Sequence, residues 1–326
     1  ITLSVDAYEE AAFTPGGPSG RNNGRGNHVG MDLEGSFEPT NALRFLAVVR
    51  QQWDRQRFHR QGTVLDIPGT KSDQQTWKLG VNVTLPEGFR VYASGGRAFG
   101  LPLLSAVMYN ASNGVAEPLA EEKSRFAILG ASWEQGHWKV TLEANRTVFT
   151  RLVYFDLNTY NYANGSDVRT QSAQLTVGYN QETWGVEGFY RNQEARDLNA
   201  AEDMKFKTPA VLRRPFQSLG LKGHLIVEPF RFDLNWSWFG PRYENFGGWP
   251  SVIGASNVHF NDLSVAATWM ARKDFTLTLR GEHLLQPKLS RKDWENRATD
   301  GDNDAYQIFG FPAQPPTWTL EARYRF

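Results

Sequence analysis

The last residues of the chain, Thr317 to Phe326, alternate between polar and apolar side chains without interruption. The apolar positions are Trp318, Leu320, Ala322, Tyr324 and Phe326, and the polar ones are Thr317, Thr319, Glu321, Arg323 and Arg325. Because successive side chains of a strand point to opposite faces, this stretch predicts a strand with one apolar and one polar face. A soluble sandwich also contains such strands. However, aromatic residues at both ends of the apolar face are typical of the interfacial girdles of a transmembrane barrel.

The same alternation recurs along the chain and predicts about fourteen strands, each roughly ten residues long, which is enough to cross a hydrocarbon layer when tilted. The predicted strands are 1–13, 28–37, 43–53, 77–85, 89–99, 127–133, 138–145, 173–179, 184–191, 219–227, 230–238, 263–269, 275–282 and 317–326. The row Phe230, Phe232, Leu234, Trp236 and Trp238 is the most regular of these apolar faces.

The connections between these strands alternate strictly between short turns and long loops. The turns lie at Pro39, Pro86–Gly88, Gln135, Gln181, Pro229 and Lys273, and the loops cover 14–27, 60–73, 100–123, 160–167, 199–213, 240–257 and 286–315. Up-and-down membrane barrels show this asymmetry, whereas soluble sandwiches have Greek-key connections. The sequence therefore predicts an all-β, antiparallel, up-and-down transmembrane barrel, with 1–326 as a single domain.

Composition excludes several other classes of protein. The chain has 35 basic and 35 acidic residues, so it carries no net field that would attract nucleic acid. It has no cysteine, which rules out disulfides and Cys-ligated metals. Its mean hydropathy of −0.50 resembles that of a soluble protein, but each strand of a membrane barrel contributes half of its residues to a polar lumen. The chain begins at Ile1 directly in strand pattern, so we expect a processed or truncated chain.

Several segments, in order and spacing, resemble TonB-dependent outer-membrane receptors. They are the Tyr-Ala-Ser-Gly-Gly-Arg-Ala-Phe run at 92–99, the acidic run Glu-Pro-Leu-Ala-Glu-Glu-Lys-Ser at 117–124, Arg-Arg-Pro at 213–215, Phe-Gly-Pro-Arg-Tyr at 239–243, and Tyr-Gln-Ile-Phe-Gly-Phe-Pro at 306–312. The branch that takes up vitamin B12 and small siderophores is the most similar. The final Tyr324 and Phe326 also resemble the signal by which outer-membrane barrels are recognised for assembly.

The resemblance implies the last fourteen strands of a 22-stranded barrel with a plugged lumen, although no plug or TonB box precedes Ile1. It also implies uptake of a scarce chelate, either a siderophore or a corrinoid, across the outer membrane of a Gram-negative bacterium. The implied partners are outer-membrane lipid and lipopolysaccharide, the barrel-assembly machinery, and TonB acting through a plug that this chain lacks. The tail departs from the family pattern at Pro315-Pro316 and at Gln286-Pro287-Lys288. The alternative is a plugless barrel closed on fourteen strands, serving as a passive pore or as a structural part of an outer-membrane complex.

Aromatic and arginine residues in the predicted external loops are the candidates for ligand contact, since such side chains stack on flat ligands. They are Tyr160, Tyr162, Arg242, Tyr243, Phe246 and Trp249. Lipid anchoring or self-packing of the loops would explain the same residues. On the lumen face, charges of both signs at neighbouring heights predict ion-pair ladders across the inner wall, among them Arg44, Arg50, Arg231, Asp233, Arg280, Glu282, Glu321 and Arg323.

Neither a metal site, nor a cofactor, nor a catalytic site is predicted. The Asp300-Gly301-Asp302-Asn303-Asp304 run has oxygen ligands at alternate positions but lacks the following bidentate Glu of a calcium loop, so a solvated loop is expected. The sequence contains no zinc-protease motif and no nucleophile elbow. A transport protein rather than an enzyme is the expectation.

Overall fold

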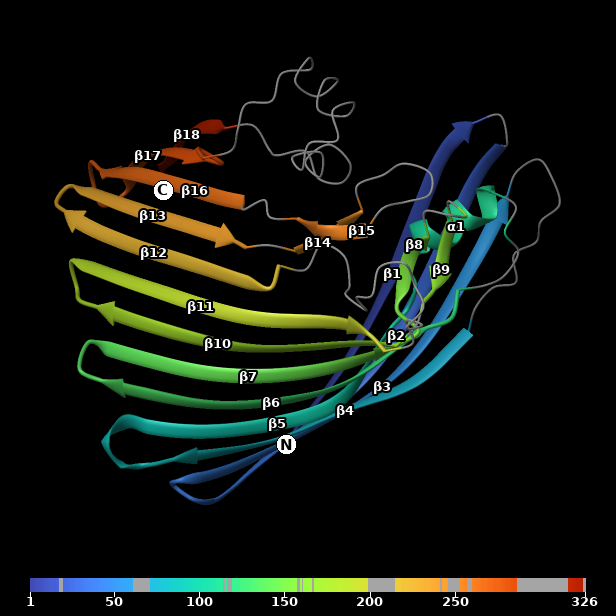
Figure 1. Ribbon diagram of the computed structural model, residues 1–326, viewed down its shortest axis with the longest axis horizontal. Coiled ribbons are helices and arrows are strands. Elements are labelled where there is room, and N and C mark those ends of the chain that lie inside the picture. The colour runs from blue at the N-terminus through green and yellow to red at the C-terminus, as the bar shows by residue number, and fades with distance from the viewer. Residues whose placement is uncertain are drawn as a thin grey trace.

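The fold is an open, strongly curved antiparallel sheet of fourteen strands, seen in a computed structural model (Figure 1). The structure describes residues 1–17, 20–60, 71–113, 115, 119–156, 159, 161–165, 167–198, 215–240, 242–245, 253–256, 260–285 and 316–324. The sheet strands are β1 (Thr2–Gly17), β2 (Gly20–Thr40), β3 (Leu43–Arg60), β4 (Lys71–Thr84), β5 (Phe89–Gly100), β6 (Glu122–Gln135), β7 (Trp138–Thr150), β10 (Val168–Asn180), β11 (Trp184–Asp197), β12 (Gln217–Val227), β13 (Phe230–Phe239), β16 (Phe260–Met270), β17 (Phe275–Glu282) and β18 (Thr317–Tyr324).

Each strand pairs with its neighbours in chain order, apart from two small hairpins that stand outside the sheet. The hairpins are β8 (Val153–Asp156) with β9 (Asn161–Asn164), and β14 (Arg242–Asn245) with β15 (Ile253–Ser256). The number and order of the strands confirm the predicted up-and-down topology. Among the described residues β18 is not paired with β1, so these fourteen strands do not close on themselves. This fits a segment of a wider barrel better than a closed smaller one.

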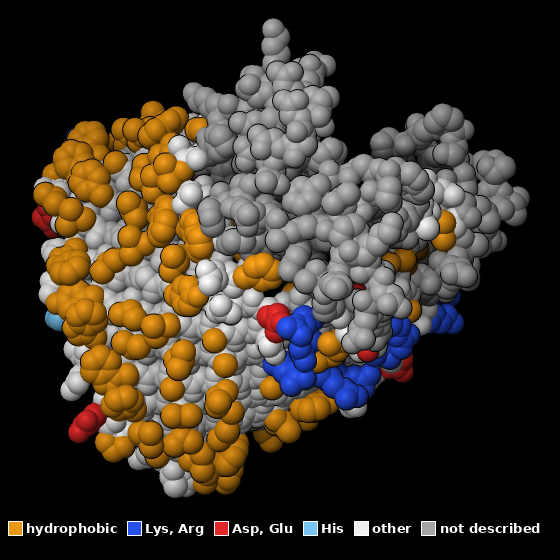
Figure 2. Space-filling model, viewed as in Figure 1, with side chains coloured by type: hydrophobic (Ala, Val, Ile, Leu, Met, Phe, Trp, Pro, Cys, Tyr) orange, Lys and Arg blue, Asp and Glu red, His pale blue; other side chains and the backbone are white. Residues whose placement is uncertain are grey.

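The convex face of the sheet is a belt of exposed apolar side chains, shown in orange in Figure 2. On β13 it consists of Phe230, Phe232, Leu234, Trp236 and Trp238, as predicted. Aromatic residues mark the edge of the belt on the turn side. Phe89 lies opposite Trp133, with ring centroids 6.3 Å apart, and Tyr179 lies 4.8 Å from Trp138 and 4.9 Å from Trp184. Such a girdle is typical of the membrane interface.

On the concave face, large aromatic rings lie flat over glycines of the neighbouring strand. Tyr92 is registered opposite Gly130, where a Cβ would lie 2.2 Å from the tyrosine Cζ. Phe189 covers Gly220 in the same way, at 2.1 Å. Glycine is therefore required at these positions, because any other side chain would displace the ring that covers it.

Three predicted loops are wrong in part, the first of them because strand pairing continues beyond the lipid belt. Residues 14–27 were expected to form a loop on account of their Gly, Pro and Asn content, but β1 continues to Gly17 and β2 begins at Gly20. Their backbone pairing outweighs the weak strand propensity of these residues. The loop 100–123 contains the helix α1 (Leu104–Ser112), and 240–257 contains the hairpin β14–β15. In the described part of the chain, no helix is long and apolar enough to cross a membrane.

Buried apolar residues lie mainly under α1 and not within the sheet. Leu104, Ala106, Val107, Met108 and Leu119 are each at most 6% exposed. α1 packs against the long ends of β1 and β2 and against β9 (Figure 1). We call α1 together with the β8–β9 hairpin the cap. Because the sheet itself is one layer thick, the cap supplies the only conventional core in the described part of the chain.

The turns are expected to face the periplasm and the cap the cell exterior, because short turns mark the periplasmic side of such barrels. Single cysteines introduced into this Cys-free chain report the two sides. On intact cells, an impermeant thiol reagent should label Asn113→Cys, at the exposed end of α1, and leave Lys273→Cys in the β16–β17 turn unlabelled. The reverse pattern would contradict the orientation. Gly88 is a poor reporter, since its φ is +80° and a Cβ would lie 2.0 Å from the Glu134 carbonyl oxygen.

Candidate functional site

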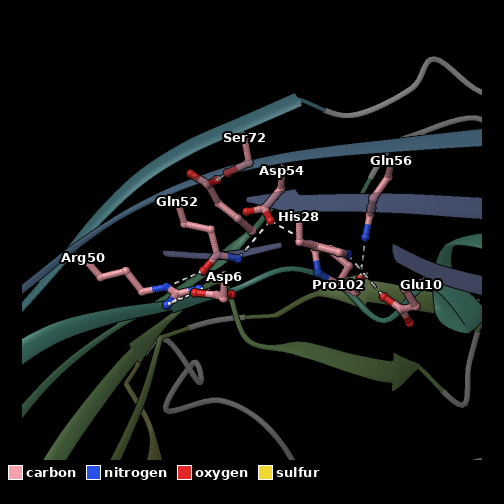
Figure 3. A network of polar contacts seen from close by, with 10 residues as sticks. Asp6, Glu10, His28, Arg50, Gln52, Asp54, Gln56, Ser72 and Pro102 are labelled. Atoms are coloured by element: carbon pink, nitrogen blue, oxygen red, sulfur yellow. Dashed lines mark hydrogen bonds and ion pairs between the residues drawn. The ribbon is translucent and has the colours of Figure 1, made fainter. Parts of the chain in front are cut away.

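Polar side chains of three neighbouring strands meet on the concave face near the cap. Strand register places Tyr8 on β1 opposite His28 on β2, and His28 opposite Asp54 on β3. Glu10 and Gln56 stand one inward position further toward the cap. We call these residues the mouth cluster; Figure 3 shows all of them except Tyr8. They lie inside because they share the parity of Asp6, opposite that of the apolar belt residues Leu3 and Val5.

The mouth cluster is tightly packed yet retains unused hydrogen-bonding capacity. The His28 Nδ1 lies 2.7 Å from the Asp54 Oδ1, with side-chain exposures of 4% and 1%. The Tyr8 ring stacks on His28 at 4.4 Å, and the Glu10 Oε2 lies 3.6 Å from the His28 Nε2, beyond hydrogen-bond range. Within the described residues, the His28 Nε2 and the Asp54 Oδ2 have no hydrogen-bond partner. Buried polar atoms are normally paired, so these two atoms keep a hydrogen-bonding capacity that the described part of the chain does not satisfy.

A chain of hydrogen bonds orients the cluster from the membrane side. Arg50 binds Asp6 through both terminal nitrogens, at 2.9 and 3.1 Å, and binds Asp32 at 2.5 Å. Its Nε donates to Gln52 at 2.9 Å, and Gln52 donates to the Asp54 Oδ1 at 2.9 Å. Bidentate arginine–carboxylate contacts fix direction as well as position. The carboxylate that holds His28 is therefore held by Gln52, which Arg50 positions in turn.

Two asparagines, one within the cap and one at its attachment to the chain before β6, imitate strand pairing. The Asn110 side chain donates to the Tyr162 carbonyl oxygen at 2.6 Å and accepts from the Tyr162 N–H at 2.7 Å. Asn164 makes the same double contact with the backbone of Ala120, at 2.9 and 2.6 Å. The Tyr109 and Tyr162 rings pack edge to face at 5.7 Å. These contacts give the cap a defined structure beside the mouth cluster. Gln56 of that cluster also contacts the Pro102 carbonyl oxygen, in the connection from β5 to α1, at 3.4 Å.

Glu121 joins the connection after the cap to β4. Its carboxylate accepts hydrogen bonds from Ser72 at 2.7 Å and Gln74 at 2.6 Å, and pairs with Lys123 at 2.9 Å. Burial raises the pKa of Glu121, but the hydrogen bonds from Lys123 and Ser72 outweigh it, so the pKa lies below the usual range for glutamate. This contact is therefore fully formed at neutral pH and weakens only as the pH falls through that lowered pKa.

A second polar surface, which we call the basin, hollows the concave face near the turns. It has a volume of 930 Å³, and its lining includes Lys139, Glu187, Lys222, Asp233, Asn235 and Arg323. The arginine ion pairs in this region run along single strands: Arg231 contacts Asp233 at 2.8 Å and Arg323 contacts Glu321 at 2.8 Å. Lys139 of β7 pairs across to Glu134 of β6 at 3.8 Å. The ion-pair ladders predicted across the wall are therefore not formed by these two arginines, each of which pairs two residues away on its own strand. Arg50 alone bridges three neighbouring strands in the described residues.

The predicted loop contacts are scattered in the structure. Tyr162 lies in β9 and packs against the core of the cap. Arg242 and Tyr243 lie in β14, paired with Ser256 and Ala255. Tyr324 ends β18, opposite Phe275, with 53% of its surface exposed. Tyr160, Phe246, Trp249 and Phe326, like the Asp300–Asp304 run, lie outside the described residues.

None of the sites predicted from the sequence includes the mouth cluster. A partial signal existed, because Glu10 and Gln56 continue the inward parity of their strands beside the polar outward residues Glu9 and Arg55. Such residues can only face the lumen above the membrane. No group of three or more potential metal ligands occurs among the described residues.

A protein-family model described as "TonB dependent receptor-like, beta-barrel" matches residues 4–325. No curated protein sequence matches the chain.

Solved structures share the fold at low sequence identity. The ferric-catecholate import receptor Fiu of E. coli K12 superposes with a TM-score of 0.65 at 13% identity, covering 99% of this chain and 51% of that receptor. The ferric yersiniabactin uptake receptor FyuA of Yersinia pestis gives 0.59 at 14% identity, with coverage of 82% and 42%. The ferripyoverdine receptor of Pseudomonas aeruginosa gives 0.62 at 14%, with 82% and 36%. The chain thus spans about half or less of the length of these receptors.

Proposed function

The chain belongs to the TonB-dependent receptor-like β-barrel family, and from this premise we propose that it forms part of the barrel wall of an outer-membrane importer for a ferric chelate. The family model describes a receptor-like β-barrel, and solved structures that share the fold are named as import and uptake receptors, so no enzymatic role is part of the proposal. In this proposal the chelate is captured at the mouth cluster and the cap. TonB then acts through a plug that sits against the basin, so the transport step needs no hydrolytic site in the barrel.

The mouth cluster is the observation that carries the proposal. It combines an exposed aromatic face at Tyr8, a carboxylate at Glu10 and unpaired polar atoms on His28 and Asp54, all at the entrance of a polar lumen. Chelates are rigid, polar molecules with aromatic or amide groups, and they are held by stacking and a few placed hydrogen bonds. A general pore would not need side chains held this firmly at its entrance.

The structural neighbours favour iron chelates over corrinoids. They include receptors for ferric catecholate, ferric yersiniabactin and ferripyoverdine, and one neighbour is a copper transporter. A siderophore is therefore the preferred cargo, and vitamin B12 becomes the comparison ligand of the test. The basin supports the plug contact, because its mixed charges offer a polar surface to an equally polar partner.

Uptake of defined chelates tests the proposal. The whole protein, produced in a strain without its own siderophore receptors, should support growth on a ferric siderophore under iron limitation, and deletion of TonB should abolish that growth. Growth that persists without TonB would indicate a passive pore. Uptake of cyanocobalamin but of no ferric chelate would contradict the proposed cargo.

A mouth variant separates capture from transport. Tyr8→Ala removes the exposed ring that is offered to the chelate. One aromatic stacking contact contributes about 0.5–1.5 kcal/mol, so binding of the ferric siderophore to whole cells should weaken roughly two- to tenfold. Tyr190→Ala, on the outward face of β11 and 40% exposed, is the matched control and should bind normally. Equal affinity in the two variants would exclude the mouth cluster as the capture site.

A further inference from the structure

A row of arginines crosses the outward face of the sheet where the apolar belt ends on the loop side. Strand register connects Arg97 of β5, Arg125 of β6, Val148 of β7, Arg169 of β10 and Arg196 of β11 in one line. These residues share the parity of the belt residues below them, so their side chains leave the sheet on the lipid side. Figure 2 shows basic side chains gathered at this border of the belt. We call the arginines of this line the arginine row.

The row places like charges next to each other. Arg97 lies directly opposite Arg125, and Arg169 directly opposite Arg196. Like charges in directly opposed positions destabilise a sheet unless an anion lies between them. Arg196 is paired with Glu194, but Arg97 and Arg125 have no acidic partner within the described residues, and the buried Nε of Arg169 lacks an acceptor. The arginine row therefore has more guanidinium groups than acidic partners.

A hollow in the same face begins beside the Arg97–Arg125 pair. It has a volume of 600 Å³; Leu79 and Gly95 line it on the belt side of the two arginines, and Trp77 stands directly opposite Arg97. The hollow is deeper at Gly95, because this residue has no side chain to fill the space between its neighbours. The hollow is thus apolar toward the membrane centre and cationic toward the loops. A free anion would use only the cationic end, whereas a lipid would use both.

We propose that the arginine row binds the phosphate groups of the glycolipid in the external leaflet, with an acyl chain of that lipid in the hollow beside Arg97. Guanidinium groups bind phosphate oxygens in a bidentate manner, and the loop side of the belt is the depth at which headgroups of the external leaflet lie. The site lies on the lipid face, opposite the mouth cluster, so it does not depend on the cargo.

Lipid binding by the whole protein tests the assignment. The protein is extracted from outer membranes, stripped of lipid in detergent and titrated with purified lipopolysaccharide, and bound lipid is counted by native mass spectrometry. Arg97→Gln/Arg125→Gln should weaken binding about tenfold or more, since charge-assisted hydrogen bonds are lost. Arg90→Gln/Arg191→Gln removes the same charge from lumen-facing positions of β5 and β11, and it should bind within twofold of the wild type.

Three further probes distinguish the sources of phosphate. Lipopolysaccharide stripped of its phosphates should bind the wild type as weakly as the intact lipid binds the Arg97/Arg125 variant. Displacement of the lipid by inorganic phosphate at equal concentration would reduce the row to a general anion site. Equal affinity for phosphatidylglycerol vesicles would indicate nonspecific attraction to anionic lipid. Displacement by inorganic phosphate or equal affinity for phosphatidylglycerol would overturn the proposal. Equal loss of lipopolysaccharide binding in the lumen-facing Arg90/Arg191 control would also overturn it. If the double variant is not recovered folded, Arg125→Gln, at an exposed position, replaces it.

Discussion

Replacing Trp236 with Arg is expected to lower the free energy of unfolding in a lipid bilayer by roughly 2–4 kcal/mol, the cost of a cation at the midplane of a barrel's lipid face. Trp236 lies in β13, on the apolar belt, between Leu221 and Leu263 of the flanking strands. It stands six positions beyond Phe230, which lies in the turn-side girdle. At about 3.3 Å per residue and a tilt of about 45°, that separation is roughly 14 Å in depth, near the middle of a band about 25 Å tall.

The neighbouring residue Asn235 is the control. Its side chain is exposed on the concave face and lines the basin, so Asn235→Arg should cost less than about 1 kcal/mol in solvated surroundings. Denaturant titrations of the whole protein refolded in lipid vesicles measure both variants. The difference between the two positions is decisive, because a soluble core would also reject arginine at Trp236. Equal penalties would contradict the assignment of the two faces.

The sequence predicts the sheet well because its physical cause is local and repeated. Each strand has lipid on one side and water on the other, so period-two alternation identifies both the strand and its lipid-facing parity. The short turns then leave each strand only its sequence neighbour as a partner. The observed register confirms this, for example Trp236 opposite Leu221 on the shared outward face.

The strand ends on the loop side are predicted poorly, because beyond the membrane no contrast between lipid and lumen marks where a strand stops. Beyond the belt both faces of β1 and β2 meet water, so alternation disappears while backbone pairing continues from Tyr8 and His28 to Gly17 and Gly20. Only the partner strand determines how far such a hairpin extends. The same reasoning applies to α1, whose apolar residues pack against the ends of β1, β2 and β9 and show no alternation.

The mouth cluster could not be predicted from residue spacing. Tyr8, His28 and Asp54 are brought together by register across three strands, and no pair of them is close in sequence. The aromatic residues chosen from composition behave differently: Tyr162 packs within the cap as a structural residue, whereas the exposed ring of Tyr8 comes from the interior of a strand. Exposure of an aromatic side chain at the mouth is a three-dimensional property that composition does not reveal.

Removing the terminal residue Phe326 is expected to reduce the amount of assembled protein in the outer membrane several-fold while barely changing the stability of barrel that has already folded. One exposed apolar side chain returned from lipid to water contributes only roughly 2 kcal/mol to stability. Loss of a recognition signal, in contrast, acts each time a new chain is presented for assembly. The final strand is well suited to this role, because the outward residues of β18 that precede the terminus, Trp318, Leu320 and Tyr324, are 53–66% exposed.

Trp318→Ala separates recognition from stability. It removes a larger apolar side chain than loss of Phe326 does, from the outward face of β18, and it uncovers Gly281, whose Cβ position lies 2.8 Å from the tryptophan ring. Trp318→Ala should therefore lower the stability of the folded barrel more than removal of Phe326 does, and lower the assembled yield less. Heat-modifiable electrophoretic migration of outer-membrane fractions measures assembled yield, and refolding titrations measure stability. Unchanged yield after removal of Phe326, or a yield that simply follows stability in both variants, would mean that the terminal aromatic residue acts only through its burial in lipid.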